Sequence, residues 1–297
     1  MRKVAISGTD NRMGYLFIAP WLIGFFFITL VPMILSFYFS FTQYDLLSSP
    51  VFVGFENYKN LIINDERFHT SLWVTFIFVI VVVPLRLAVS LGIALLLFRD
   101  PKGHSLYKTL FYLPSLFGGS VAIAVMWRQL FSSYGPIASF IRLFNPGFEK
   151  SIVGSPNTAS LTIIILLAWQ FGSTMLIFLA GLKNIPKVYY EVSKIDGAGP
   201  VTTFFKITFP QLSSVFFFNL ILTIINSFMI FSQAYIITEG GPVDKTLYLV
   251  LYAFKRGFEY FQMGSSSAIT WILLLILSAV IGFFFANSKR WVYYESK

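Results

Sequence analysis

Three side-chain amides in one long apolar stretch are the residues most able to recognise a ligand. Asn219, Asn226 and Gln233 are each seven residues apart, and a helix brings residues at that spacing close to one face. An unpaired amide is costly in apolar surroundings, so this stripe should face protein or water. Two interpretations stay open: a path for a hydroxyl-rich solute, or hydrogen bonds that hold a helical bundle together.

A second polar group with aromatic rings lies earlier in the chain. Trp169 and Gln170 are adjacent, so a ring for stacking stands beside an amide for hydrogen bonding. We treat both as candidates for a solute path. Ser173, Thr174, Thr270 and Trp271 are further candidates. Aromatic belts at membrane surfaces explain tryptophans near helix ends equally well.

Arg86 follows Pro84 by two residues inside another apolar stretch. An arginine within a membrane is a functional hypothesis by default. No Asp or Glu lies in any predicted span to pair with it. We favour a structural role, in which Arg86 contacts carbonyls freed by Pro84 or a partner subunit.

The chain has no pattern typical of an enzyme. There is no cysteine, and no Gly-Lys pair of a phosphate-binding loop. His69 and His104 stand alone, without metal or triad spacing. We therefore expect no catalytic residue, no metal and no cofactor on this chain. The net charge of +9 comes without a long basic run or an RNA-binding motif, so no nucleic acid partner is expected.

Composition points to a membrane. Of 297 residues, 56% are hydrophobic and only 12% are charged, against about 25% charged in soluble domains; the mean hydropathy is +0.73. Six stretches are long enough to span a bilayer, which takes about 20 helical residues. They are 15–41, 72–98, 111–131, 159–182, 215–237 and 268–286. The sequence predicts an all-α polytopic membrane protein whose single transmembrane domain covers 1–297, with a core of about 14–286.

Basic residues predict the orientation. With the N-terminus in the cytoplasm, thirteen Lys and Arg residues lie in cytoplasmic segments and seven in outer loops. Positive residues favour the cytoplasmic side. We expect both termini to be cytoplasmic, and lipid to surround the spans.

The segment between the fourth and fifth spans has the most specific pattern. Val188, Val192 and Ile195 recur at helical spacing and form one apolar face. Gly197 and Gly199 end that helix, and Pro200 begins another. We expect two short helices with a sharp bend, in a coupling loop defined here as residues 183–212. By pattern alone, an interfacial amphipathic helix without a partner is the alternative.

This loop resembles the signature segment, the EAA loop, of binding-protein-dependent ABC importer permeases. The matching positions are Glu191, Asp196, Gly197, Ala198, Phe204, Ile207 and Pro210. The resemblance implies that the loop couples to an ATPase subunit, with Glu191, Asp196, Gly197, Ala198 and Pro210 as the coupling residues. Val192 and Ser193 replace the two alanines of the family pattern.

Other segments resemble the carbohydrate-type branch of these permeases. They are residues 53–58 (VGFENY), 112–114 (YLP), Trp127, and 238–242 (TEGGP) followed by Thr246. The resemblance implies the type I importer permease fold in a bacterial cytoplasmic membrane. It also implies four kinds of partner: a second, different permease, two ATPase subunits that carry ATP and Mg, and an extracytoplasmic sugar-binding protein. The cargo would be a sugar or an oligosaccharide.

The main alternative is a secondary transporter driven by an ion gradient. Such proteins often carry carboxylates within the membrane, together with inverted repeats. The predicted spans contain no Asp or Glu, which argues against proton coupling.

Overall fold

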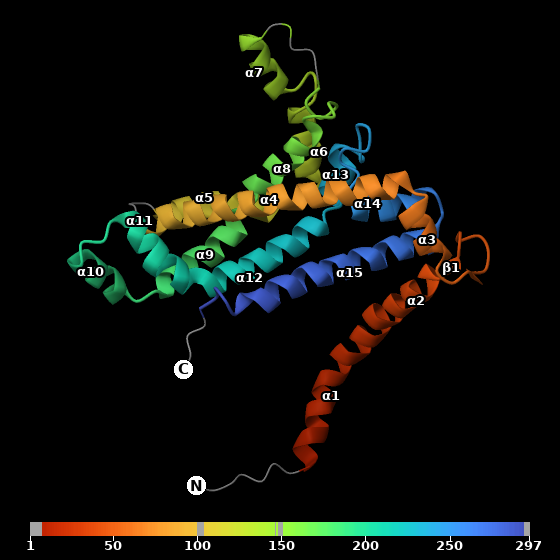
Figure 1. Cartoon of the computed structure of the whole chain (residues 1–297), viewed down its shortest axis with the longest axis horizontal. Coiled ribbons are helices and arrows are strands. Elements are labelled where there is room, and N and C mark those ends of the chain that lie inside the picture. Colours follow the sequence, from red (N-terminus) through yellow and green to blue (C-terminus); the bar gives the residue numbers. More distant parts are fainter. Residues whose placement is uncertain (1–7, 100–103, 146, 148–150, 294–297) are drawn as a thin grey trace. The chain divides into compact units, whose positions relative to one another are not determined.

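The computed structural model describes residues 8–99, 104–145, 147 and 151–293. These residues are mostly helical (Figure 1). Their contacts divide the chain into two compact units. Unit 1 comprises 1–64 and 253–271, and unit 2 comprises 65–252 and 272–297.

Unit 1 begins with one long helical run and continues through a small hairpin. The run comprises α1 (Gly8–Gly24), the π-helical η1 (Phe25–Leu30) and α2 (Val31–Ser40). The hairpin pairs β1 (Thr42–Gln43) with β2 (Val51–Phe52), antiparallel. The remaining elements are α3 (Glu56–Ile63), the end of α14 (Leu249–Phe254), η3 (Lys255–Glu259) and the start of α15 (Met263–Ser288).

The 53–58 motif has a structural role in unit 1. The Asn57 side-chain amide donates to the carbonyls of Ser40 at 2.9 Å and Thr42 at 2.8 Å. The Tyr58 hydroxyl donates to Ser40 Oγ at 2.7 Å. These bonds tie α3 to the end of the first long helical run, so Asn57 and Tyr58 find their partners within unit 1.

Unit 2 is built around α4 (Glu66–Phe98), which packs against α8, α9 and α12. Asp65 caps α4, because its carboxylate accepts from the Phe68 N–H at 2.9 Å. The other helices are α5 (His104–Phe117), α6 (Val121–Leu130), α7 (Pro136–Phe144), α8 (Ala159–Trp169), α9 (Gly172–Asn184), α10 (Lys187–Ile195), α11 (Pro200–Thr203), η2 (Phe204–Thr208), α12 (Phe209–Phe228) and α13 (Ser232–Ile237). Much of α14 and the later part of α15 also belong to this unit.

The described residues contain four helical runs long and apolar enough to cross a membrane, or six if each bent pair is one span. All six predicted stretches are thereby accounted for, but three are not continuous helices. The third predicted span bends by 96° between α5 and α6, and the fourth by 41° between α8 and α9. Gly118 and Gly119 lie at the first bend, where glycine gives the backbone its freedom.

The fifth predicted span ends early, so the three amides do not lie on one continuous helix. Helix α12 stops at Phe228, and α13 begins only at Ser232. Asn219 and Asn226 therefore share one helix, whereas Gln233 belongs to the next. No Gly or Pro marks this break in the sequence.

Candidate functional site

The coupling loop contains the two short helices and the sharp bend that the sequence predicts. Helix α10 ends at Ile195. Two residues later, Gly197 has a φ of +71°. The Gly197 N–H donates to the Lys194 carbonyl at 3.1 Å, and the Ala198 N–H donates to the Ser193 carbonyl at 2.9 Å. This pair of bonds is a Schellman motif, which ends a helix through a left-handed residue and favours glycine there. Gly197 is therefore placed where a turn requires it.

One side of α10 is fastened to the body of unit 2. The Ser193 hydroxyl lies 2.9 Å from Thr203 Oγ1, and the Tyr190 hydroxyl lies 3.3 Å from Thr208 Oγ1. The Tyr190 ring packs 5.9 Å from that of Phe98, at the end of α4. Ser193, which departs from the alanine of the family pattern, is buried, and its hydroxyl takes part in this attachment.

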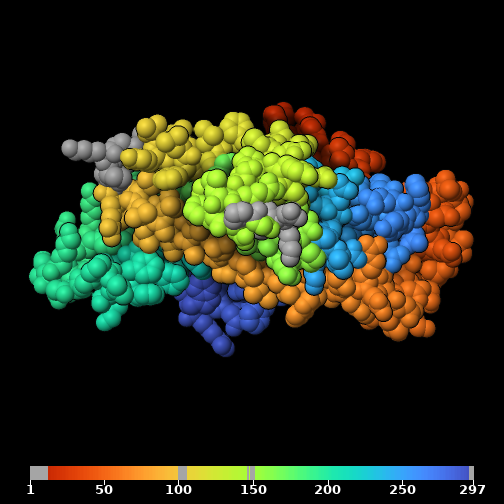
Figure 2. All heavy atoms as spheres, turned by 90° about the horizontal axis from the view of Figure 1, so that it is seen from above, coloured from red at the N-terminus to blue at the C-terminus, as the bar shows by residue number. Residues whose placement is uncertain are grey.

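The other side of α10 is apolar and open. Val188, Val192 and Ile195 are 56%, 50% and 85% exposed. Glu191 and Asp196 are exposed too, and neither forms an ion pair with any described residue. Figure 2 shows α10 and α11 as the teal segment at the left edge of the molecule. Of the predicted coupling residues, Glu191 and Asp196 are therefore available to another chain.

Pro210 lies apart from that exposed face. It stands in the first turn of α12 and is half-buried. The Ser213 hydroxyl donates to its carbonyl at 2.6 Å. Helix α12 continues directly from η2, so Pro210 lies inside the helical run 200–228. The position of Pro210 therefore indicates a role in shaping the loop.

Arg86 contacts a backbone carbonyl, as expected, but one freed by a different break. Its Nη2 donates at 3.0 Å to the carbonyl of Gln170, at the bend between α8 and α9. The Ser115 hydroxyl donates to the same carbonyl at 3.1 Å. The Ser90 hydroxyl donates to the carbonyl of Phe171 at 3.2 Å. Helices α4 and α5 thus satisfy the carbonyls that the broken fourth span releases.

The candidates Gln170 and Trp169 are both engaged within unit 2. The Gln170 side-chain amide donates to the Gly118 carbonyl at 2.7 Å and so joins the two bent spans at their breaks. A Cβ at Gly118 would lie 2.3 Å from Gln170, so glycine is required for this approach. Trp169 stacks on Trp127 with ring centroids 5.6 Å apart.

The three amides of the expected stripe have different surroundings. Asn219 is buried, and its Nδ2 has no hydrogen-bond partner among the described residues. Asn226 is exposed and Gln233 is half-buried. Among the described residues, Asn219 is the one of the three whose amide is both buried and without a hydrogen-bond partner. The two interpretations of this stripe stay open.

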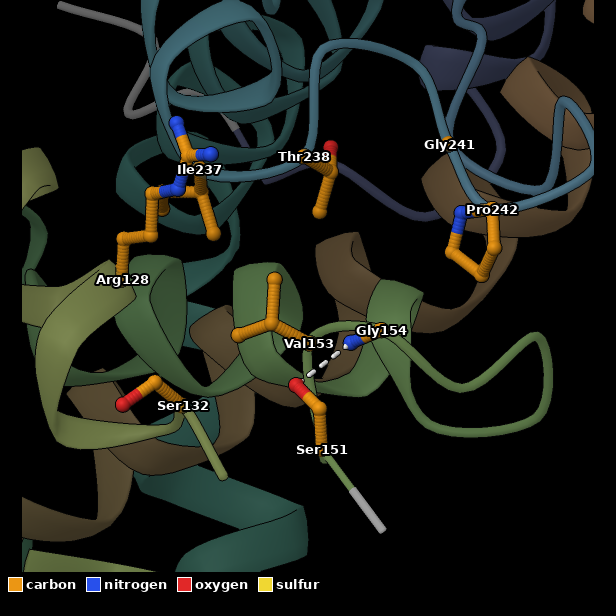
Figure 3. Close-up of a pocket in the computed structure, with 9 residues that line it drawn as sticks. All are labelled: Arg128, Ser132, Ser151, Val153, Gly154, Ile237, Thr238, Gly241 and Pro242. Atoms are coloured by element: carbon orange, nitrogen blue, oxygen red, sulfur yellow. Dashed lines mark hydrogen bonds between the residues drawn. The ribbon is translucent and has the colours of Figure 1, made fainter. Parts of the chain in front are cut away.

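A pocket of about 340 Å³ lies where α6 approaches α13 (Figure 3). Arg128 lines it and donates to the Ile236 carbonyl and to Glu239, each at 3.2 Å. The sequence did not predict that Arg128 joins α6 to α13, because it shows only a basic residue near the end of a helix. Among the described residues, no group of three or more His, Asp or Glu side chains could hold a metal ion.

The TEGGP segment closes the same end of unit 2. The Thr246 hydroxyl donates to the Gly241 carbonyl and to Thr238 Oγ1, both at 2.7 Å. Gly240 has a φ of +88° and packs against Leu247. The contacts of this segment are therefore made within unit 2 and stabilise its own loop.

The fold is shared with a solved ABC transporter. One chain of the crystal structure titled as a bacterial alginate ABC transporter in complex with alginate pentasaccharide-bound periplasmic protein superposes with a TM-score of 0.82. The match covers 95% of this chain and 96% of that one, at 18% identity. That likeness establishes the type I importer permease fold.

Sequence comparison identifies the family. The family described as "Binding-protein-dependent transport system inner membrane component" matches residues 15–292. The Bacillus subtilis protein named "Probable ABC transporter permease protein YesP" is 48% identical, over 100% of this chain and 97% of its own length. The B. subtilis protein named "Arabinooligosaccharides transport system permease protein AraP" is 33% identical, over 90% of this chain and 85% of its own length. The chain therefore belongs to this family of multi-pass ABC importer permeases and is a transport component, not an enzyme.

Proposed function

We propose that this chain is one transmembrane half of an importer for a sugar or an oligosaccharide. Relatives carry names that refer to arabinooligosaccharides, starch degradation products and sn-glycerol-3-phosphate. The partners we propose are a second, different permease, two ATPase subunits and an extracytoplasmic sugar-binding protein. ATP and Mg belong to the ATPase subunits.

The observation that carries the proposal is the difference between the two sides of α10: one side is attached to unit 2 and the other is exposed. Its inner side is fastened by the Ser193–Thr203 and Tyr190–Thr208 contacts. Its outer side leaves Val192 and Ile195 exposed, which is unfavourable in water without a partner. A helix that is rigid on one side and apolar on the other suits a groove on a second protein. We propose that this groove is on the ATPase.

The same geometry suggests how force is passed on. The helix is held against the end of α4 and the start of α12, both of which belong to membrane-spanning runs. Movement of the ATPase groove would then turn these helices together, as a rigid body. Glu191 would hold α10 in the groove, because a carboxylate beside an apolar face fixes register through a charged partner.

The domain and orientation follow from this assignment. We propose one transmembrane domain over 1–297, with the coupling loop and both termini on the cytoplasmic side. The ATPase that would meet the loop is cytoplasmic, and the bias of Lys and Arg agrees with that side.

For the solute path we propose Asn219, Asn226 and Gln233 first, and Trp169 and Gln170 second. Asn219 supports this order, since its amide has no partner among the described residues. Gln170 is already bonded to Gly118, which favours a structural role. A second permease would complete the path.

The experiment is purification of the tagged chain from its native membrane in mild detergent, with mass spectrometric identification of the proteins recovered. A second permease and an ATPase should accompany it, and the associated binding protein should bind sugars in a ligand screen. Recovery of the chain alone, moving solute without ATP, would overturn the proposal.

A paired variant makes the test specific to α10. Val192→Asp with Ile195→Asp should lose the ATPase while keeping the second permease. Leu47→Asp is the control, because Leu47 is 90% exposed on the hairpin loop and lies outside α10. Loss of the ATPase in the control, or its retention in the double variant, would contradict the role of this helix.

A further inference from the structure

A second cavity lies on the inner side of the coupling loop, away from the exposed apolar face. It measures about 800 Å³, and its lining residues come from the end of α4, from α10 and α11, and from η2 with the residues around it. Tyr190 and Lys194 contribute to it from α10. They are four residues apart and lie on the face opposite Val188 and Val192. A protein that docks on the exposed apolar face therefore leaves this cavity free.

The cavity combines positive charge with apolar walls. Arg99 and Lys194 line it, and none of its thirteen lining residues is acidic. Both side chains belong to exposed residues, and neither forms an ion pair with a described residue. Phe205 and Val201 form part of the wall and are 65% and 68% exposed. A ligand that fits needs a negative group and a hydrocarbon part.

Hydroxyl groups add hydrogen-bonding capacity. Ser193 and Thr203 bond to each other, and both line the cavity. Only one hydroxyl of such a pair donates to the other, so the second proton remains free for a ligand oxygen. A phosphate carries several acceptor oxygens and suits a cation beside a hydroxyl donor.

The place of the cavity in the fold identifies the ligand class. Arg99 is the residue directly after α4, and Phe204 and Phe205 lie near the start of the next long run, 200–228. Both runs are long and apolar enough to cross a membrane, so the cavity would lie near the lipid headgroups on the side proposed to be cytoplasmic. Basic pockets between transmembrane helices near the cytoplasmic surface bind anionic lipid headgroups.

We propose that this cavity binds the phosphate of an anionic phospholipid, with Arg99 and Lys194 on the headgroup and the Phe205 wall along an acyl chain. The lipid would brace the inner side of α10 against α4 and η2. The inference rests on the cytoplasmic placement of the coupling loop proposed above, but not on which solute is transported or which protein meets α10.

The test uses the complex purified in detergent, whatever subunits accompany the chain. Native mass spectrometry follows binding of phosphatidylglycerol and of phosphatidylcholine. The wild type should retain phosphatidylglycerol in preference. Arg99→Gln with Lys194→Gln should weaken that binding by about 30-fold, from the typical contribution of two basic residues near an anionic lipid. Lys289→Gln with Arg290→Gln is the matched control, since these exposed residues remove the same two charges elsewhere.

Each outcome decides the matter. Equal binding of the two lipids, unchanged binding in the cavity variant, or an equal loss in the control would overturn the proposal. Inorganic phosphate that displaces phosphatidylglycerol at low concentration would instead assign the site to a soluble anion. If the cavity variant does not assemble, a photoreactive phosphatidylglycerol on the wild type replaces it. Crosslinks at Leu95 or Phe205 support the site, and crosslinks confined to other helices overturn it.

Discussion

The charged side chains near the two ends of helix α4 differ in whether they form bonds with other described residues. At its Glu66 end, Arg67 makes a two-pronged contact with Asp244 at 2.8 Å, and Asp65 accepts from the Tyr252 hydroxyl at 2.6 Å. At its Phe98 end, Arg99 forms no ion pair with any described residue, and neither does Glu191 of α10, the helix whose Tyr190 packs on Phe98. The charged side chains named at the Glu66 end are thus bonded within unit 2, whereas those named at the Phe98 end have no ion pair among the described residues.

The difference also separates two kinds of motif. Asn57 of VGFENY bonds within the chain, and so does Thr238 of TEGGP, through Thr246. In the coupling loop, Gly197 and Ser193 shape the backbone, whereas the carboxylates of Glu191 and Asp196 have no partner among the described residues. A polar residue that leaves its hydrogen-bonding capacity unused on a rigid element is the better candidate for contact with another molecule.

The largest effect expected from this comparison is on transport. Glu191→Ala should lower ATP-dependent uptake at least tenfold in assembled complexes, because truncating one side of a charged interface contact typically costs about 2 kcal/mol or more. Glu239→Ala is the matched change at the other end. It removes only an exposed pair with Arg128, so uptake should change less than about twofold. Equal uptake by the two variants would break the comparison.

The next effect is on stability. Here the larger loss should come from a substitution at the Glu66 end of α4. Asp65→Ala removes both the cap of α4 and the bond from Tyr252. We expect a loss of about 3 kcal/mol from the cap and the charge-assisted bond together. Asp196→Ala removes an exposed carboxylate without an internal bond and should cost under about 0.5 kcal/mol. Thermal unfolding in detergent measures both, and a larger loss from Asp196→Ala would reverse the comparison.

Two glycines with positive φ give a smaller contrast. A Cβ at Gly240 would meet Leu247 Cδ1 at 3.0 Å, whereas a Cβ at Gly197 would meet nothing within 4 Å. Gly240→Ala should therefore cost about 2 kcal/mol, from strain and crowding, and Gly197→Ala about 1 kcal/mol from strain alone. Thermal unfolding again provides the measurement. Identical losses would mean that the loop around Gly240 relaxes to accept the methyl group.

The sequence was most informative where local chemistry decides the structure. The bend of the coupling loop followed from Gly197 and Pro200, because a left-handed residue and a missing N–H act within a few residues. The six apolar stretches followed from composition. The alternative of an ion-gradient-driven transporter is excluded by the family match.

Long-range contacts set the limit of prediction. The break of α12 after Phe228 carries no Gly or Pro signal. The carbonyl that Arg86 contacts lies 84 positions away, at Gln170. Such contacts depend on how helices pack, and helical spacing alone does not specify them. Arg99 was likewise counted only as a basic loop residue, because its cavity forms from segments far apart in sequence.

Asp45 provides the smallest test, as a carboxylate that is satisfied within its own turn. It accepts from the Ser48 hydroxyl at 2.6 Å and from the Ser48 N–H at 2.8 Å. The side-chain bond from Ser48, followed by the backbone bond, lowers the pKa of Asp45 below its usual value of 3.8. The charged form thus favours the folded turn. That preference is present above pH 3.8 and is lost as the pH falls through the lowered pKa.

Ser48→Ala removes the largest cause of that shift and should move the pKa of Asp45 back toward 3.8, because one of the donors to its charged form is gone. Proton titration of Asp45 by NMR measures the change, and amide exchange at Ser48 should quicken at low pH in the wild type. Leu47→Ala is the control, since it keeps the Leu47 N–H that donates to the same oxygen. An unchanged pKa in Ser48→Ala would show that the turn holds its charge through the backbone. The difference between the bonded carboxylate of Asp45 and the carboxylate of Glu191, which is unpartnered among the described residues, would then come from backbone N–H donors and not from a neighbouring hydroxyl.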